Sequence, residues 1–167
     1  MRAWAHALAI VAGIAAPVAL TFWTTSASGP RNAAQSAEIA QETMTPKQVV
    51  EAFERLAFDE GNPTEAVRRY VSKDVIDHSQ RIAGDYDSII ELLVNLDWTN
   101  GRGPKRTIQH MVAEGDIVMV HYHLVREPGT PGFAAVDIFR VQGGKIVEHW
   151  EALQPLPDIS SNKHGPF

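Results

Sequence analysis

The hydrophobic pattern changes its period between the two halves of the chain, and this change limits the possible folds more than any other feature. Apolar residues recur at helical spacing in the first half. In the second half, four stretches rich in Val, Ile, Phe and His are separated by short turn sequences. We predict strands at 107–114, 117–126, 133–141 and 145–153, joined as a meander. Helices followed by such strands indicate an α+β domain, with the helices packed on one face of a curved sheet.

Three helices are predicted in the first half. Thr45-Pro46-Lys47-Gln48 is a capping box with proline at the first helical position, so a helix is expected from Pro46 to about Glu60. A second, short helix is expected at 62–70 and a third at 85–96, with an extended or irregular segment between them at 71–81. The single layer of helices on a bent sheet would leave a cone-shaped interior suited to a small molecule.

The first 28 residues have the anatomy of a secretory signal. Arg2 precedes an apolar run at 3–23, and the small residues after it would allow cleavage near residue 28. The alternative is an uncleaved membrane anchor, because about 20 apolar residues also span a bilayer. Both interpretations predict an exported domain, periplasmic, secreted or anchored outside the cytoplasm. We expect a flexible linker at 29–44, the folded domain at 45–157 and a C-terminal tail at 158–167.

Composition excludes several classes of function. The sequence contains no Cys, which excludes disulfides, thiolate nucleophiles and Cys-ligated zinc. The net charge is -5 and no basic cluster is present, so nucleic-acid binding is not expected. The chemistry that remains belongs to His, Asp, Glu and hydroxyl groups.

Two histidines and one aspartate stand out in the predicted strands. His121 and His123 share one face of their strand. Asp137 interrupts an apolar strand, where a carboxylate is costly unless it is paired or functional. The hairpin between the two strands would bring Asp137 beside either His123 or Tyr122, depending on the register. His149 follows on the next strand.

A metal site is a further alternative. Gly115, the His121-Tyr122-His123 segment and Glu127 follow the opening of the cupin motif, in which two His and a Glu hold a divalent ion. The match stops there, because Ala134 stands where the motif has its closing glycine and the front helices do not belong to a jelly roll. We therefore expect no metal or other cofactor.

Several segments resemble the SnoaL-like polyketide cyclases of the nuclear transport factor 2-like superfamily. They are the segments 113–116, 118–123, 136–140 (Val-Asp-Ile-Phe-Arg), 144–151 (Gly-Lys-Ile-Val-Glu-His-Trp-Glu) and 154–155. The resemblance covers about residues 46–167. It implies a cone-shaped α+β fold with three N-terminal helices packed on a strongly curved, mostly antiparallel sheet. It also implies a homodimer formed through the outer sheet face and a cofactor-free aldol ring closure by an acidic residue on an inner strand.

The resemblance also implies roles for individual residues. Asp137 corresponds to the acid/base aspartate and His123 to the neighbouring histidine of the pocket, so both are expected to be catalytic. The side chains expected to bind substrate are His78, His121, His149, Trp98 and Trp150. Asp137, with a pKa raised by an apolar pocket, would take a proton from the carbon next to a carbonyl, while His123 or His121 donates to the enolate.

The expected function is therefore that of an exported protein that binds a small, largely apolar carbonyl compound. It would catalyse aldol-type cyclisation or isomerisation without a cofactor. The alternative is a non-catalytic binding module with the same fold.

Overall fold

The computed structural model describes residues 32–96, 103–159 and 161–167. The predicted signal or anchor at 1–28 and the predicted pocket residue Trp98 lie outside these ranges. Within them, no helix combines the length and the apolar character needed to cross a membrane.

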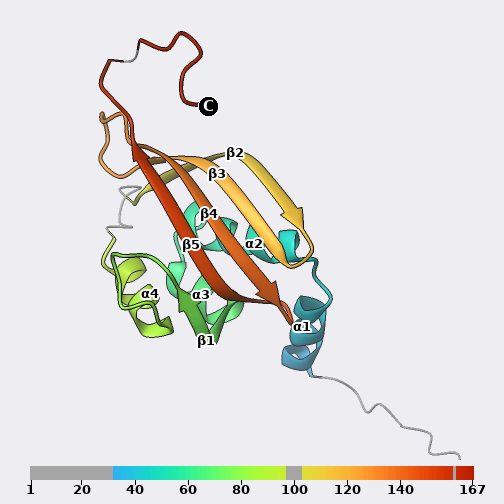
Figure 1. The fold of residues 1–167 in the computed structure, drawn as a ribbon. Helices are drawn as coiled ribbons and strands as arrows, with labels where there is room; N and C mark the ends of the chain where they lie inside the picture. The colour runs from blue at the N-terminus through green and yellow to red at the C-terminus, as the bar shows by residue number, and fades with distance from the viewer. Residues whose placement is uncertain (1–31, 97–102, 160) are drawn as a thin grey trace, which may run out of the picture. The chain divides into compact units, whose positions relative to one another are not determined.

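Five strands form one open, mixed sheet in the order β1-β5-β4-β3-β2 (Figure 1). They are β1 (Val71–Asp77), β2 (Lys105–Glu114), β3 (Ile117–Val125), β4 (Phe133–Gln142) and β5 (Lys145–Pro155). The four predicted strands are present as an antiparallel meander. The segment expected to be extended or irregular supplies β1, which pairs with β5 in parallel.

Three helices cover one face of this sheet, as the sequence predicts (Figure 1). They are α2 (Pro46–Glu54), α3 (Pro63–Tyr70) and α4 (Tyr86–Val94), and α2 continues as a π-helical turn at Arg55–Asp59. The predicted capping box at the start of α2 is present: the Thr45 hydroxyl accepts from the Gln48 backbone N–H, and the Gln48 side chain accepts from the Thr45 N–H. The fold belongs to the predicted α+β class.

The linker prediction is wrong for most of its length. Residues Ala33–Glu42 form helix α1, which begins at the N-cap Asn32. The helix is held to the domain by Gln41, whose side-chain amide donates to the carbonyl oxygens of Arg69 (2.7 Å) and Gly144 (2.9 Å). The Ala- and Gln-rich composition that suggested a tether also has high helix propensity, and the end of the helix contacts the domain through the Gln41 side chain and through the backbone at Gln41 and Glu42, which lies close to Gly144.

The strand alternation decides which face of the sheet is interior. On β3, the buried side chains are Val118, Val120, Tyr122 and Leu124, at most 7% exposed. They pack against the core residues of α2, such as Val49 and Val50. Fully burying a Val side chain stabilises by roughly 1.5–3 kcal/mol. The alternate positions, which carry both histidines of β3, therefore face outward.

Candidate functional site

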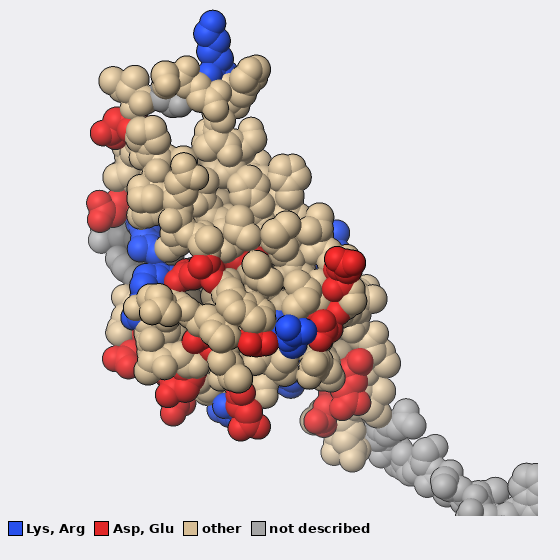
Figure 2. Space-filling model, viewed as in Figure 1, with Lys and Arg blue, Asp and Glu red and all other residues tan. Residues whose placement is uncertain are grey.

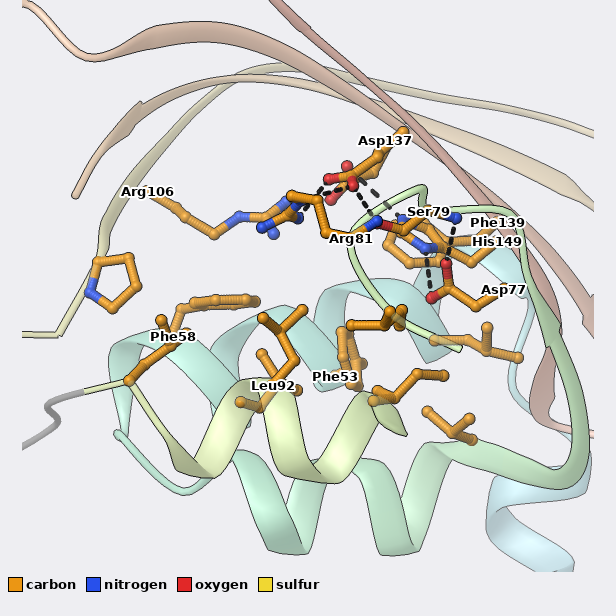
Figure 3. Close-up of a pocket in the computed structure, with 18 of the residues that line it drawn as sticks. Phe53, Phe58, Asp77, Ser79, Arg81, Leu92, Arg106, Asp137, Phe139 and His149 are labelled. Carbon is orange, nitrogen blue, oxygen red and sulfur yellow. Dashed lines mark hydrogen bonds and ion pairs between the residues drawn. The ribbon is translucent and has the colours of Figure 1, made fainter. Parts of the chain in front are cut away.

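A cavity of about 120 Å³ lies between the helices and the inner face of the sheet. Its helix side is apolar and includes Phe53, Phe58, Ile89, Leu92 and Leu96. Its strand side carries the ionisable side chains Arg106, Asp137 and His149, which converge at one point (Figure 3). A closed cavity of roughly 150 Å³ can hold benzene, so this space suits a ligand of about one ring with a polar group at one end.

Asp137 is the centre of the polar side. Its carboxylate is buried, with 5% of the side chain exposed. Oδ1 accepts a hydrogen bond from the Tyr122 hydroxyl at 2.9 Å, and Oδ2 accepts from Nη2 of Arg106 at 2.8 Å. Register explains this set: Asp137 pairs with Val120, so Tyr122 and Asp137 are inward-facing side chains of adjacent strands.

The pKa of Asp137 is lowered, where the sequence predicted a raised value. Burial alone would raise this pKa, but the positive charge of Arg106 and the nearby His149 outweigh it and hold the pKa well below its usual range. The sequence prediction counted the apolar surroundings and could not count the two cations, which come from β2 and β5.

Arg106 connects Asp137 with a second buried acid. Its guanidinium carbon lies 3.6 Å from the Tyr122 ring centroid and 4.3 Å from that of Phe58. Nη2, which holds Asp137, is also 3.0 Å from Oε1 of Glu54, the last residue of α2. Burial raises the pKa of Glu54 to about 7, although the Arg106 charge acts to lower it. Arg106 is thus a cation shared by two carboxylates.

His149 is the second cation beside Asp137. Its Nδ1 lies 2.9 Å from Oδ2 of Asp77, and its Nε2 lies 3.6 Å from Oδ1 of Asp137. The second distance is too long for a hydrogen bond, and the buried Nε2 has no hydrogen-bond partner among the described residues. Burial acts to lower the pKa of His149, but the two carboxylates raise it to about 10. The ring is therefore an imidazolium at neutral pH.

The polar side of the pocket continues to an ion pair that is partly exposed. Arg81 holds Glu151 with two hydrogen bonds, at 2.9 and 2.6 Å, and the Ser79 hydroxyl donates to the same carboxylate. Burial acts to raise the pKa of Glu151, but these donors lower it overall. Glu151 is therefore already paired with Arg81 and Ser79. Asp137 and His149 remain as the central groups of the site.

Of the two neighbours predicted for Asp137, Tyr122 makes the contact and His123 does not. His123 lies on the outer face, where its Nε2 is 2.7 Å from the carbonyl oxygen of Pro131 and its ring packs on Phe167 of the C-terminal tail. His121, the other predicted donor, also faces outward and stacks on His110, with Nδ1 atoms 3.2 Å apart. Even spacing put both histidines on one face, but it could not say that this face lies opposite Asp137.

Two other predicted pocket residues also lie outside the pocket lining. His78 and Trp150 stack with ring centroids 5.0 Å apart, and Nε2 of His78 is 3.0 Å from Oε1 of Glu148. Of the predicted site residues that the structure describes, Asp137 and His149 line the cavity.

The sequence analysis missed three polar partners of these two residues: Glu54, Asp77 and Arg106. Arg106 stands just before the predicted start of its strand, and Asp77 lies in the segment at 71–81 that was expected to be extended or irregular. Glu54 could have been found, because it follows the buried Val50 by one helical turn. Tyr122 was predicted as one of two possible neighbours of Asp137, and its hydroxyl makes that contact.

The metal alternative gains no support from the arrangement of side chains. Over the ranges described, no three His, Asp or Glu side chains are grouped so that they could hold an ion. His121 and His123 lie on the outer face of β3, and Glu127 lies in the loop that follows the strand.

Comparison with known families agrees with this architecture. The family model described as a SnoaL-like domain matches residues 49–149, more than half of the chain. The chain therefore belongs to the SnoaL-like domain family. Among proteins with curated descriptions, none matches the sequence.

Solved structures of similar fold come from several bacteria. One is an NTF2-like protein of unknown function from Cytophaga hutchinsonii, with 17% identity, a TM-score of 0.54 and coverage of 68% of this chain and 93% of that one. Another is IdmH from Streptomyces antibioticus, a proposed polyketide cyclase, with 20% identity, a TM-score of 0.50 and coverage of 66% and 93%. A third is an LEH-like epoxide hydrolase from M. tuberculosis, with 19% identity, a TM-score of 0.51 and coverage of 65% and 82%. At these identities the likeness shows the NTF2-like fold.

Proposed function

We propose that the pocket binds a small, largely apolar carbonyl compound and catalyses proton abstraction from the carbon next to the carbonyl group. The observation that carries this proposal is a buried carboxylate, Asp137, held between two cations on one wall of an apolar cavity. The two cations can stabilise a carbonyl oxygen that becomes negative, and the carboxylate can accept the proton. The apolar wall can contact the carbon skeleton of the compound.

The proposed reaction begins with the carbonyl oxygen near Arg106 and His149. Asp137 takes a proton from the adjacent carbon, and the electrons of the broken C–H bond form the enolate, whose oxygen is stabilised by the two cations. In an aldol ring closure, the enolate carbon attacks a second carbonyl carbon of the same molecule, and the new alkoxide takes the proton from Asp137. In an isomerisation, Asp137 returns the proton to a different carbon. Neither sequence of steps requires a cofactor.

The low pKa of Asp137 limits the substrates that it can deprotonate. A weak base needs an acidic C–H bond, such as one flanked by two carbonyl groups. A bound carbonyl oxygen would also compete with Asp137 for the Arg106 hydrogen bond and for the positive charge of His149, and the pKa of Asp137 would then rise. Both effects favour compounds with more than one carbonyl group.

The test is deuterium exchange from D2O into ketones that fit a cavity of one ring. Pentane-2,4-dione, whose central C–H bonds are flanked by two carbonyl groups, and a linear seven-carbon diketone, whose ring closure gives a methylcyclohexenone, would be followed by NMR. We expect exchange with the native protein and a loss of about 10²–10⁴-fold in Asp137→Asn. Asp158→Asn, in the exposed tail, is the matched control and should exchange normally. Equal rates in the two variants would remove Asp137 from the reaction.

A non-catalytic binding module remains the second candidate function. Its specific support is that both oxygens of Asp137 already accept hydrogen bonds, from Tyr122 and Arg106. Saturable binding of the ketones in calorimetry, with no exchange above the buffer rate, would favour this function.

We also propose that the domain is exported by the leader at 1–28, either cleaved or kept as an anchor. The support is the arrangement of an arginine, an apolar run and small residues in the sequence. Fractionation of the producing cells and the intact mass of the recovered protein would test it. A mature chain that begins near residue 28 supports cleavage, and an intact chain in the membrane fraction supports the anchor. Intact protein in the cytoplasm argues against both.

A homodimer formed through the outer sheet face is a further proposal. Its support is a pair of exposed apolar side chains, Val112 of β2 and Met119 of β3, which lie opposite each other on the outer face. In the upper part of Figure 2, over the sheet, acidic and basic side chains are sparse. Sedimentation of the native protein and of Met119→Lys would test it: we expect a dimer that the substitution weakens.

A further inference from the structure

We propose that Asp77 is a positioning residue that holds His149 with its Nε2–H free to donate to the oxygen of the bound compound. The part of this inference that concerns the bound compound rests on the proposed function. The part that concerns the Asp77–His149 pair stands on the contacts described next.

The first support is the fixed place of the Asp77 carboxylate. Asp77 pairs with His149 in the parallel register of β1 and β5, so the two side chains are neighbours on one face of the sheet. Oδ2 of Asp77 lies 2.9 Å from Nδ1 of His149, and Oδ1 accepts from the Ser79 backbone N–H at 2.7 Å. With both oxygens engaged and 5% of the side chain exposed, the carboxylate cannot rotate without losing a bond.

The backbone around Asp77 is fixed as well. Its N–H donates to the carbonyl oxygen of Gly84 at 2.9 Å, which closes the loop that leads to α4. Gly84 has a φ of 91°, and a Cβ built on it would lie 2.6 Å from the Asp77 carbonyl oxygen. This close approach requires glycine. The loop therefore holds Asp77 from the backbone side while Ser79 holds it from the side-chain side.

The fixed position of Asp77 determines the role of Nε2, the second ring nitrogen of His149. Because an ionised Asp77 only accepts, Nδ1 of His149 must carry a hydrogen and donate it. The ring also stacks on Phe139, with centroids 4.9 Å apart, which limits its rotation. Nε2 is then the nitrogen left for the cavity, on the side of Asp137 (Figure 3). It is buried and has no hydrogen-bond partner among the described residues.

The charges around His149 give His149 and Asp137 different roles in the site. Asp77 and Asp137 lie within ion-pair distance, and Glu54 and Arg106 are the nearby charged groups on α2 and β2. Two carboxylates keep the ring protonated, so His149 donates and Asp137 remains the proton acceptor. Asp77→Asn would keep the shape of the side chain at this position but would remove one of the two negative charges beside His149.

The test uses ¹⁵N NMR of the His149 ring in uniformly labelled full-length protein, titrated from pH 5 to pH 11. In the native protein we expect both ring nitrogens to remain protonated at pH 8, because the pKa is raised to about 10. Asp77→Asn should lower the pKa of His149 by about 1–3 pH units. Asp74→Asn, an exposed position on the same strand, is the matched control and should leave the titration unchanged.

The same variants would be compared in the pH profile of pentane-2,4-dione exchange. We expect the rate of Asp77→Asn to fall at a lower pH than the rate of the native protein, while Asp74→Asn follows the native profile. A merely structural role of Asp77 would change the rate without moving the profile, and this would overturn the inference. So would a titration of His149 that Asp77→Asn does not move.

Two outcomes keep this test separate from that of the proposed function. A neutral His149 ring in the native protein at pH 8 overturns the inference even if Asp77→Asn does not fold. Absence of exchange in the native protein, together with the expected titrations, contradicts the proposed function and leaves the Asp77–His149 pair supported.

Discussion

The inner and outer faces of the sheet carry similar residue types in opposite environments. His149 faces inward on β5, is 16% exposed and lies between two carboxylates. His123 faces outward on β3 and contacts a backbone carbonyl and the aromatic ring of Phe167. Electrostatic interactions are far stronger where water is excluded. The comparison shows that the chemistry of a histidine in this fold depends on the face of the sheet that it occupies.

The ion pairs on the two faces of the sheet show the same contrast between a buried and an exposed environment. Arg106 and Asp137 form a buried pair in which each side chain is less than a tenth exposed. On the outer face, Arg140 pairs with Asp116 and Glu148 while about a third of its side chain remains exposed. The inner pair therefore depends on the presence of both partners, whereas water can replace a partner of the outer pair.

Removal of Arg106 should give the largest effect. Arg106→Met leaves Asp137 and Glu54 buried without their shared cation, so we expect the free energy of unfolding to fall by about 3–5 kcal/mol. Urea denaturation followed by circular dichroism would measure it. A loss below about 1 kcal/mol would mean that the inner pair behaves like a surface pair, and the contrast between the faces would fail.

Substitution of the two histidines compares the faces directly. His149→Gln should lower the rate of ketone exchange by about 10²-fold, the usual cost of removing one donor to a developing oxyanion. His123→Gln should exchange at the native rate, because its side chain lies on the opposite face. The reverse result would return the catalytic role to His123, as the sequence first suggested.

The pH dependence of the protein's stability should also reflect the charged groups on the inner face. The pKa of His149 in the folded protein is about 10, above its ordinary value of 6.5. The protonated ring therefore stabilises the fold fully below about pH 6.5, and this contribution is lost as the pH rises toward 10. Thermal unfolding of the native protein should show the decline, and His149→Gln should flatten it. If the native protein and His149→Gln lost stability equally as the pH rises, the ion pairs of His149 with Asp77 and Asp137 would be contradicted.

The smallest effect is expected on the outer face. Arg140→Met removes a cation paired with two partly exposed carboxylates, and we expect a loss of less than about 1 kcal/mol in the same urea experiment. A loss as large as that of Arg106→Met would show that exposure does not separate the two pairs.

The sequence predicts the fold well because its signals are local. The capping box at Thr45, the turns between strands and the period of two in the second half each involve residues close together in the chain. The parallel pairing of β1 with β5 is not local, and it was missed. The helix α1 was missed although its signals are local: Asn32 and Gln35 form a capping box at its start, and the Ala- and Gln-rich composition was taken for a tether.

The candidate site was predicted only in part. Asp137 was found because a charge within an apolar strand is conspicuous in any register. Its partners Arg106, His149 and Tyr122 come from three different strands, and only the register brings them together. The choice of His123 over Tyr122 required knowing which face of β3 is interior, and the unbroken apolar series at Val118, Val120 and Leu124 was the signal that pointed to it.

The π-helical turn after α2 makes the pocket depend on the number of residues as well as on their identity. Phe53 and Phe58 are five positions apart, and both line the cavity, because the wider turn brings positions five apart onto one side. In a regular α-helix of 3.6 residues per turn, such positions diverge. Loss of one residue among 55–57 would therefore rotate Phe58 away from Arg106 without removing any residue that lines the cavity. Insertions and deletions at this turn offer a route by which related chains could reshape the cavity.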